Sequence, residues 1–294
     1  MEIRKAERKK AKLRLGIAAP SGAGKTYSAL LLAFGLGGKV GLIDTEHGSG
    51  DLYAHLGDYD IIGIEAPYTV AKYTQAIKAF EQAGYNTVII DSLSHAWSGD
   101  GGLLDKQGKM ADRGTNSFAA WRTITPEHNA LVDAMLSSPC HIIATMRAKQ
   151  EYVLETNSKG KQEPKKVGMA PVQREGMEYE FTVMLDVDMN HIASASKDRT
   201  SLFDGQYMKI TPDTGKMLLS WLETGVEPPA FSDAVFEGNQ IAMFDAETLE
   251  GLQAAFKTAY TYAKGFNNAE AVTAATSVYN GRKAELTAPA EEAA

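Results

Sequence analysis

The eight residues 19–26 constrain the fold of this chain more than any other stretch of its sequence. They read APSGAGKT and lie between two apolar runs, LRLGIAA at 13–19 and YSALLLAFGL directly after the loop. Glycines at positions 22 and 24 allow the backbone to curl and to point its N–H groups at an anion. The pattern therefore predicts a phosphate-binding loop between a buried strand and a helix.

The residues of this loop have expected roles toward a nucleotide. Lys25 reaches the β- and γ-phosphates, the Thr26 hydroxyl binds Mg²⁺, and the N-terminus of the following helix faces the anion. ATP and Mg²⁺ are therefore the predicted cofactors. The residues expected to bind the nucleotide are Pro20, Ser21, Gly22, Ala23, Gly24, Lys25, Thr26 and Tyr27.

Apolar runs alternate with helical patterns along the first half of the chain. A helix is expected over 69–83, and another is expected to begin at a Thr125 cap with Pro126 in its first turn. Further buried strands are expected at 39–46, 86–91 and 141–146. This alternation predicts an α/β core with a mostly parallel central sheet flanked by helices.

The distribution of charge divides the chain into segments. Residues 1–14 carry seven Lys or Arg against two Glu, whereas residues 225–294 carry four against ten acidic residues. Two apolar stripes at helical spacing predict a small C-terminal helical appendage. We expect a basic N-terminal arm at 1–12, the α/β core at 13–224, a linker at 225–244, a helical hairpin at 245–288 and a disordered tail at 289–294.

Two carboxylate residues stand at the ends of apolar runs that follow the predicted loop in the sequence. Asp91 ends TVIID, where a carboxylate beside the phosphate loop would support Mg²⁺, with a cap or turn role as the alternative. Glu46 closes the strand over 39–46 and is the candidate to orient or deprotonate an attacking water. Its alternative is a solvated acidic residue in a turn.

Two stretches between the expected elements are long, 95–117 and 148–176. Loops of this length in a compact domain are usually functional or disordered. Aromatic residues flank the first stretch, and Trp121 and Phe118 are expected in the core. The second is basic and is expected to neutralise the phosphates of single-stranded DNA. Its candidate DNA-binding residues are Lys159, Lys161, Lys165, Lys166 and Arg174.

The segments LIDTEHGSGDLYAHLG at 42–57 and NTVIIDSLSHAW at 86–97, in this order after the loop, resemble RecA-type recombinases. With the basic start, they are most similar to bacteriophage RecA-like ATPases of the single-strand annealing and recombination type. The resemblance covers about 13–224 and implies that Glu46 is catalytic, that Tyr53 packs near the adenine, and that both long stretches face single-stranded DNA. Recombinases carry a Gln that senses the γ-phosphate where this chain has ATMRAKQ, so Arg147 is a candidate for a different sensor.

Lys197 and Arg199 lie two apart in SASKDRTSLF, and such residues point to one face of a strand. They resemble a Lys-x-Arg pair that RecA-like helicases and RadA-type proteins project into the nucleotide site of a neighbouring subunit. The resemblance implies a catalytic role in trans and a head-to-tail ring or filament. The alternative is a solvated edge strand with cations that oppose aggregation.

These observations predict an ATP-dependent single-stranded DNA-binding protein of phage recombination, with slow, DNA-modulated ATP hydrolysis. It would promote annealing or strand exchange, with single-stranded DNA, further copies of itself and a single-strand-binding protein as partners. The alternatives are a helicase-like motor, a small-molecule kinase and a regulatory ATPase. The single cysteine, Cys140, fits a reducing cytoplasm, which is that of the bacterial host if a phage encodes the chain. The sequence has no run of eighteen apolar residues, so no membrane span is predicted.

Overall fold

The computed structural model describes residues 5–156, 162–227, 230–266 and 268–287, with the backbone alone for 150–156 and 162–168. The chain divides into two compact units, the first ending at Val226 and the second beginning at Glu227. No helix in the described ranges is long and apolar enough to span a membrane.

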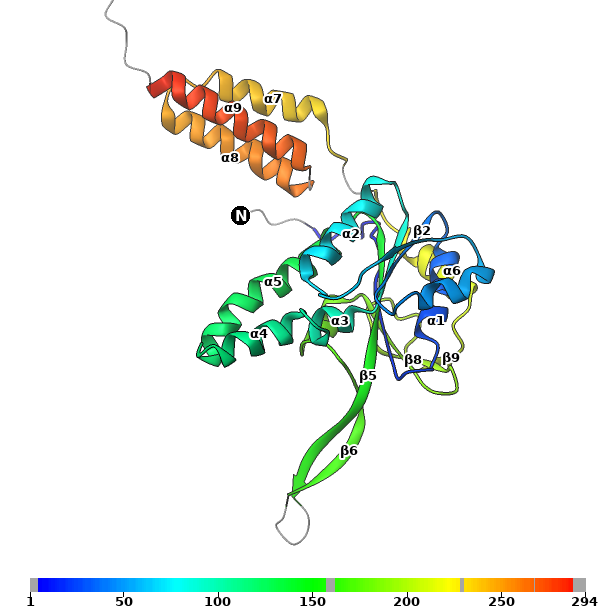
Figure 1. Ribbon diagram of the computed structural model, residues 1–294. Helices are drawn as coiled ribbons and strands as arrows, with labels where there is room; N and C mark the ends of the chain where they lie inside the picture. Colours follow the sequence, from blue (N-terminus) through cyan, green and yellow to red (C-terminus); the bar gives the residue numbers. More distant parts are fainter. Residues whose placement is uncertain (1–4, 157–161, 228–229, 267, 288–294) are drawn as a thin grey trace, which may run out of the picture. The chain divides into compact units, whose positions relative to one another are not determined.

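The first unit is built on a mostly parallel sheet with the strand order β3-β2-β4-β5-β1-β7-β8-β9, in which β6 pairs only with β5 (Figure 1). Strands β1 to β5 and β7 run parallel to one another in the sheet, and β8 and β9 are antiparallel additions at one edge. The strands are β1 Arg14–Ala19, β2 Val40–Asp44, β3 Asp60–Gly63, β4 Thr87–Asp91, β5 His141–Thr156, β6 Gln162–Pro171, β7 Val183–Val187, β8 Ala193–Asp198 and β9 Tyr207–Met208.

Helices cover both faces of this sheet because its central strands are apolar on both sides (Figure 1). Ile90 faces a cluster that includes residues of α2 and α5, and its neighbour Ile89 faces a second cluster that includes residues of α1 and α6. Both side chains are fully buried, and each such burial contributes roughly 2 kcal/mol. The helical segments are α1 Lys25–Leu36, η1 Ser49–Leu56, α2 Val70–Gln82, α3 Leu93–Ser98, α4 Leu103–Asp112, α5 Ser117–Ser137, η2 Met177–Glu180 and α6 Pro212–Leu222. The expected α/β class is therefore confirmed.

Helix α5 begins earlier than the sequence signal predicts. Instead of starting at Thr125, it is capped by Asn116, whose side chain accepts a hydrogen bond from the Phe118 N–H, and it continues through Pro126. Ala120 and Ile124 are buried before the proline, on the face that packs against the core. Burial of this face outweighs the local cost of proline in a helix interior.

The stretch expected as a loop at 148–176 contains the outer part of β5 and all of β6, which pair antiparallel and form a long hairpin that projects from the body of the unit (Figure 1). Strand β5 runs without interruption from the central sheet into this hairpin. Its outer part is rich in charged residues, so the apolar alternation that identifies a strand is missing there. The other stretch, 95–117, contains the end of α3 and all of α4.

The basic arm is attached to the first unit over the residues that the structure describes. The guanidinium of Arg8 lies 4.1 Å from the ring centre of Trp221 and donates to the carbonyl oxygens of Trp221 and Thr224 at 2.6 and 3.1 Å. Lys9 forms an isolated parallel bridge with Val226. Arg8 therefore binds the end of α6 of its own chain.

The second unit contains α7 Asp233–Phe244, α8 Leu249–Gly265 and α9 Ala269–Thr287. Helix α7 lies within the expected linker at 225–244, because Ser232 caps it and Phe236 and Met243, two turns apart, are buried in the core of this unit. Helices α8 and α9 occupy the expected hairpin at 245–288. The tail expected at 289–294 lies outside the described residues.

Candidate nucleotide-binding site

The loop at 19–26 connects the end of β1 directly to the start of α1, as its sequence predicts. Gly22 and Gly24 have φ angles of 82° and 87°, in the left-handed region that residues with a Cβ rarely adopt. The backbone therefore curls in front of the N-terminus of α1, which is the arrangement that binds phosphate. Lys25 begins the helix, and its Nζ lies 3.3 Å from the carbonyl oxygen of Pro20.

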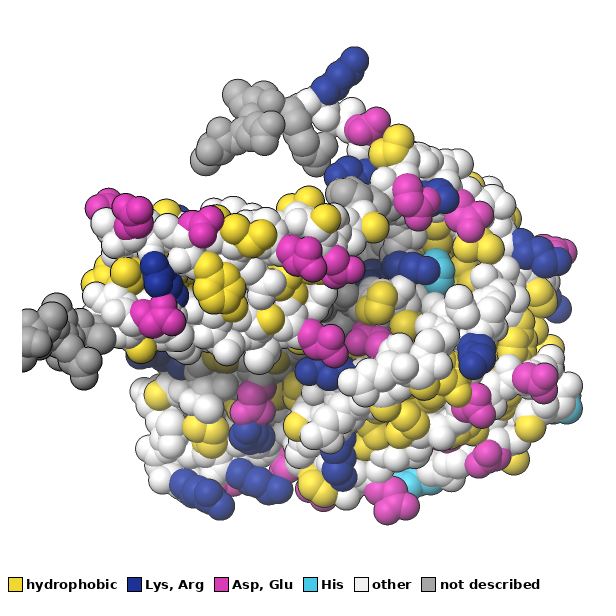
Figure 2. All heavy atoms as spheres, turned by 90° about the horizontal axis from the view of Figure 1, so that it is seen from above, with side chains coloured by type: hydrophobic (Ala, Val, Ile, Leu, Met, Phe, Trp, Pro, Cys, Tyr) yellow, Lys and Arg dark blue, Asp and Glu magenta, His cyan; other side chains and the backbone are white. Residues whose placement is uncertain are grey.

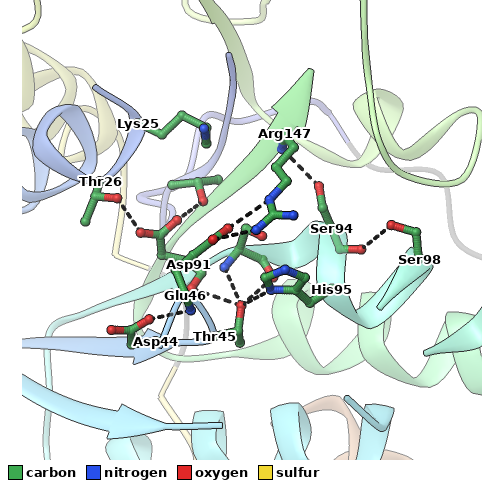
Figure 3. Close-up of polar contacts among 12 residues, drawn as sticks. Lys25, Thr26, Asp44, Thr45, Glu46, Asp91, Ser94, His95, Ser98 and Arg147 are labelled. Atoms are coloured by element: carbon green, nitrogen blue, oxygen red, sulfur yellow. Dashed lines mark hydrogen bonds and ion pairs between the residues drawn. The ribbon is translucent and has the colours of Figure 1, made fainter. Parts of the chain in front are cut away.

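Asp91 lies beside this loop at the end of β4 (Figure 3). Its Oδ2 accepts from the Thr26 hydroxyl and its Oδ1 from the Thr145 hydroxyl, each at 2.5 Å. Burial raises the pKa of Asp91, although both hydroxyls and the charge of Lys25 act in the opposite direction. A carboxylate left in this environment favours a bound cation.

The oxygen atoms of Thr26 and Asp91 are the hard donors that Mg²⁺ prefers, so these residues fit the ion. Among the described residues, no group of three or more His, Cys, Asp or Glu side chains could hold a metal. Mg²⁺ at this position would therefore complete its coordination with phosphate oxygens and water.

Glu46 and Arg147 form an ion pair at the same edge of the sheet (Figure 3). The Nε of Arg147 donates to Oε1 of Glu46 at 3.0 Å, and Nη2 donates to Oε2 at 2.5 Å. Burial alone would raise the pKa of Glu46, but the hydrogen bonds and charge of Arg147 outweigh it and hold that pKa below its ordinary value.

Backbone contacts fix the position of Glu46. Oδ1 of Asp44 accepts from the Glu46 N–H at 2.6 Å, and its Oδ2 accepts from the Gly50 N–H at 3.0 Å. Thr45 ties the end of β2 to the end of β4, because its N–H donates to the Asp91 carbonyl at 2.7 Å. The Glu46 carboxylate is thus held at the edge of the sheet that faces the phosphate loop.

Two adjoining pockets open at this edge. The first, of about 680 Å³, is lined by Lys25, Thr26, Glu46, Asp91 and Arg147 and has the polar groups that a polyphosphate requires. The second, of about 430 Å³, shares Gly22, Gly24 and Tyr53 with the first and is more apolar. Its further lining residues are Tyr27, Ser28, His191, Lys209 and Ile210.

The second pocket is suited to a nucleobase. Tyr27 and Tyr53 lie edge to face, with ring centres 6.1 Å apart. Both were predicted near the nucleotide, whereas His191 was not, because it follows the turn between β7 and β8 and its position depends on the tertiary structure. Its Nδ1 lies 3.1 Å from the carbonyl oxygen of Ala23 and so connects this turn to the phosphate loop.

Lys197 and Arg199 lie away from the phosphate loop of their own chain. Lys197 is in β8, which runs antiparallel to β7, and the register places it level with the start of β1. Its Nζ donates to the carbonyl oxygens of Glu178 and Tyr179 at 3.0 and 2.5 Å, and Nη2 of Arg199 donates to that of Tyr179 at 3.1 Å. The structure therefore does not bring this pair together with Lys25 and Glu46 of the same chain.

The predicted DNA-binding residues fall in different environments. Lys159 and Lys161 lie outside the described residues, and Lys165 and Lys166 are on β6, whose backbone pairs with β5. Arg174 donates to the Thr125 hydroxyl at 3.2 Å and lies 5.8 Å from the ring centre of Trp121, so it binds helix α5.

The two aromatic residues expected in the core differ. Trp121 is partly buried and stacks on Trp97 at 5.9 Å between ring centres, which confirms the expectation. The side chain of Phe118 is 84% exposed, so the same expectation for it is wrong. Phe118 occupies the first turn of α5, on the side of the helix that faces away from the core.

The fold and the site together define the class, an α/β P-loop fold with its phosphate loop, the Thr26–Asp91 pair and Glu46 at one edge of a mostly parallel sheet. A family model described as an AAA domain matches residues 11–216, and the chain belongs to that family. Among solved structures, the crystal structure of the RadB recombinase is similar, with 18% sequence identity, a TM-score of 0.36, and coverage of 69% of this chain and 90% of that chain. The comparison with curated proteins gives no match.

Proposed function

We propose that this protein is an ATP-dependent single-stranded DNA-binding protein of phage recombination that promotes strand annealing or strand exchange as a ring or filament. The observation that carries its ATP-dependent part is one pocket lined by the phosphate loop, the Thr26–Asp91 pair and Glu46. Membership of the AAA-domain family supports the same interpretation.

The residues of the pocket divide the work of ATP hydrolysis. Lys25 and the N–H groups of the loop bind the β- and γ-phosphates, and Tyr27 and Tyr53 border the adenine. Mg²⁺, when held by Thr26 and Asp91, would offset the negative charge of the phosphates. Glu46 orients the attacking water and takes its proton while the bond between the γ-phosphorus and the bridging oxygen breaks, which releases ADP and phosphate.

Lys197 and Arg199 are proposed to act on a neighbouring subunit. Because they lie level with the start of β1, a neighbour's nucleotide can reach them only in a head-to-tail arrangement, which forms a ring or a filament. In this conformation both side chains donate hydrogen bonds to backbone carbonyl oxygens of their own chain. The γ-phosphate of the neighbour would replace them as the acceptor.

The β5–β6 hairpin is the proposed DNA-binding element, with Lys159, Lys161, Lys165 and Lys166 as its cations. On the face that Figure 2 shows, the Lys and Arg side chains of the described residues lie among Asp and Glu side chains. The exposed ring of Phe118 is available to stack on a base. A single-strand-binding protein would supply the coated strand for annealing.

The test is the anisotropy of a labelled single-stranded oligonucleotide, titrated with protein at two salt concentrations. ATP with Mg²⁺, ADP and no nucleotide are compared, with Lys25→Ala as the control. Cooperative, salt-sensitive binding that needs both ATP and Lys25 supports the proposal, and annealing rates then follow. Absence of binding in every nucleotide state would contradict a DNA role.

Phe118→Ala tests the stacking contact within the same assay. We expect about tenfold weaker DNA binding, since stacking of one base contributes roughly 1 to 3 kcal/mol. Phe244→Ala, which removes an exposed phenylalanine from α7, is the matched control and should bind DNA as the unaltered protein does.

A further inference from the structure

Arg147 binds both oxygens of Glu46, the proposed base, in the conformation that the structure shows. The two carboxylate oxygens accept hydrogen bonds from the guanidinium, at 3.0 and 2.5 Å. A two-point contact of this kind is among the stronger polar contacts in proteins and fixes the plane of the carboxylate. A water molecule that approaches the γ-phosphate would therefore meet a carboxylate whose orientation is fixed and whose pKa the guanidinium holds below its ordinary value.

The backbone of Arg147 is held in place, so only its side chain can change partners. Its N–H donates to the Ser94 hydroxyl at 2.9 Å, and its carbonyl oxygen accepts from the Val172 N–H at 2.7 Å. In the β1–β5 register it lies opposite Ala19, the first residue of the phosphate loop. The side chain of Arg147 is about half exposed and lines the polyphosphate pocket.

The pocket offers the guanidinium a second anion when a nucleoside triphosphate is bound. The planar fork of an arginine matches a phosphoryl group as well as it matches a carboxylate. Lys25, Thr26 and Asp91 line the same pocket, so the phosphate chain would extend toward Arg147. Only a triphosphate carries the terminal group, because a diphosphate ends one phosphoryl group earlier.

We propose that Arg147 is a positioning residue that holds Glu46 in an inactive ion pair until the γ-phosphoryl group of a bound nucleoside triphosphate takes its place on the guanidinium. This proposal rests on the proposed function of the pocket. Exchange of partners frees both oxygens of Glu46 at the moment when its substrate is present. A bound diphosphate leaves the ion pair intact, so the carboxylate is available with substrate and engaged with product.

The exchange predicts a specific coupling between Glu46 and Arg147 in binding, which is measured without catalysis. The dissociation constants of a non-hydrolysable ATP analogue and of ADP are determined by calorimetry with Mg²⁺ for the unaltered protein, Glu46→Gln, Arg147→Met and the double variant. The quantity compared is the ratio of the ADP constant to the ATP-analogue constant. Because a neutral amide at position 46 competes weakly for the guanidinium, we expect this ratio to rise about tenfold in Glu46→Gln.

The background without Arg147 separates partner exchange from simple loss of a negative charge near the phosphates. There the same Glu46→Gln change should alter the ratio by less than about twofold, because no guanidinium is released. In the Arg147→Lys background, which keeps the positive charge and loses the planar fork of the guanidinium, Glu46→Gln should raise the ratio by a factor between these two values. Glu65→Gln removes an exposed carboxylate that does not line the pocket and should leave the ratio unchanged.

Three results overturn the proposal, and they differ in what else they affect. An unchanged ratio in Glu46→Gln, or the same rise with and without Arg147, would show that the ion pair does not exchange with the γ-phosphoryl group, while nucleotide binding itself would stand. Failure of the unaltered protein to bind either nucleotide would overturn both the exchange and the proposed function. Circular dichroism confirms that each variant is folded, and Arg147→Lys replaces Arg147→Met in the cycle if the latter is not.

Discussion

Asp91 is a buried carboxylate whose neighbours hold it in place without compensating its charge. Two hydroxyls donate to its oxygens, and Lys25 lies near enough to favour the ionised form, yet burial still raises its pKa. The folded protein without ligand therefore carries an unfavourable charge at the point where a cation is expected. A site of this kind sacrifices stability for binding.

We expect Asp91→Asn to stabilise the protein without nucleotide and to abolish its stabilisation by ATP with Mg²⁺. The amide has the shape of the carboxylate: one of the two threonine hydroxyls, Thr26 or Thr145, can rotate to accept from its NH₂ group, while the other still donates to its oxygen. Removal of the buried charge should raise the free energy of unfolding at neutral pH by roughly 1 to 2 kcal/mol. Urea unfolding with and without ligand measures both effects, and a less stable ligand-free variant would contradict this account.

His141 is a second buried titratable residue, and its charge state depends on pH. Burial, with smaller contributions from Lys12 and Arg14, lowers its pKa to about 4, and its Nδ1 accepts from the Leu13 N–H at 3.0 Å. In the unfolded chain the pKa is about 6.5, so the unfolded state binds more protons between these values. The free energy of unfolding should therefore fall as the pH falls from 6.5 to 4, by roughly 3 kcal/mol at most.

His141→Asn should remove most of this pH dependence, since its amide oxygen can accept from Leu13 and does not titrate. Urea unfolding of both proteins at several pH values between 4 and 7 measures the difference. The same slope in the two proteins would mean that other groups cause the acid sensitivity.

At the scale of single residues, the sequence is informative where a role depends on local spacing. Lys25 and Thr26 follow from the loop pattern, and Asp91 and Glu46 from their places at the ends of apolar runs. The pairing of Glu46 with Arg147 joins residues far apart in the sequence and depends on strand order, which spacing does not encode. One sequence signal was available at this site. Thr145 and Arg147 are two residues apart at the end of a predicted strand, and this spacing places two polar side chains on one face of the sheet.

At the scale of elements, helices α1 and α6 pack closely against each other. Gly35 and Gly215 lie where these helices meet, and a Cβ on Gly215 would lie 2.3 Å from the carbonyl oxygen of Leu32. The helix that follows the phosphate loop is thereby held against the body of the unit. Small side chains at such a contact allow the backbones to approach, and nothing in the local sequence distinguishes them from other glycines.

Gly215→Ala should destabilise the protein by about 2 to 3 kcal/mol, because the added methyl group meets backbone atoms that cannot rotate away. Gly108→Ala is the matched control within α4 of the same unit, since a Cβ there meets nothing within 4 Å. That change should be neutral or stabilise by up to about 1 kcal/mol through helix propensity. Thermal and urea unfolding test both, and equal effects would show that α1 and α6 do not pack as closely as described.

The elements themselves were predictable to different degrees. Buried strands and the helix after the loop have strong apolar patterns and were located correctly. The outer part of the β5–β6 hairpin lacks apolar alternation, and α5 contains Pro126, so local signals gave a loop in one case and a late helix start in the other. In both cases contacts outside the segment, strand pairing and burial, decide the structure.

At the scale of the whole molecule, the positions of Lys25 and Arg199 within one chain decide how an active site could be assembled. Arg199 lies beyond the end of β8, level with the start of β1, whereas Lys25 follows the end of β1. One chain therefore presents its phosphate loop and its Lys197–Arg199 pair at opposite ends of the sheet. If both serve hydrolysis, each site needs two chains, and the interface joins two different surfaces.

We expect two inactive variants to restore ATP hydrolysis when they are mixed. Arg199→Ala keeps an intact phosphate loop, and Lys25→Ala keeps an intact Arg199, so a neighbouring pair in one of its two orders forms a complete site. Random assembly of equal amounts should restore about a quarter of the unaltered activity, because about one interface in four has that order. Mixing Arg199→Ala with the double variant Lys25→Ala/Arg199→Ala is the control, since that mixture has no intact Arg199. Recovery in the first mixture alone would place Arg199 in its neighbour's site. Light scattering confirms that both variants assemble. If they assemble and activity does not recover, Lys197 and Arg199 support η2 within their own chain, through their contacts with Tyr179.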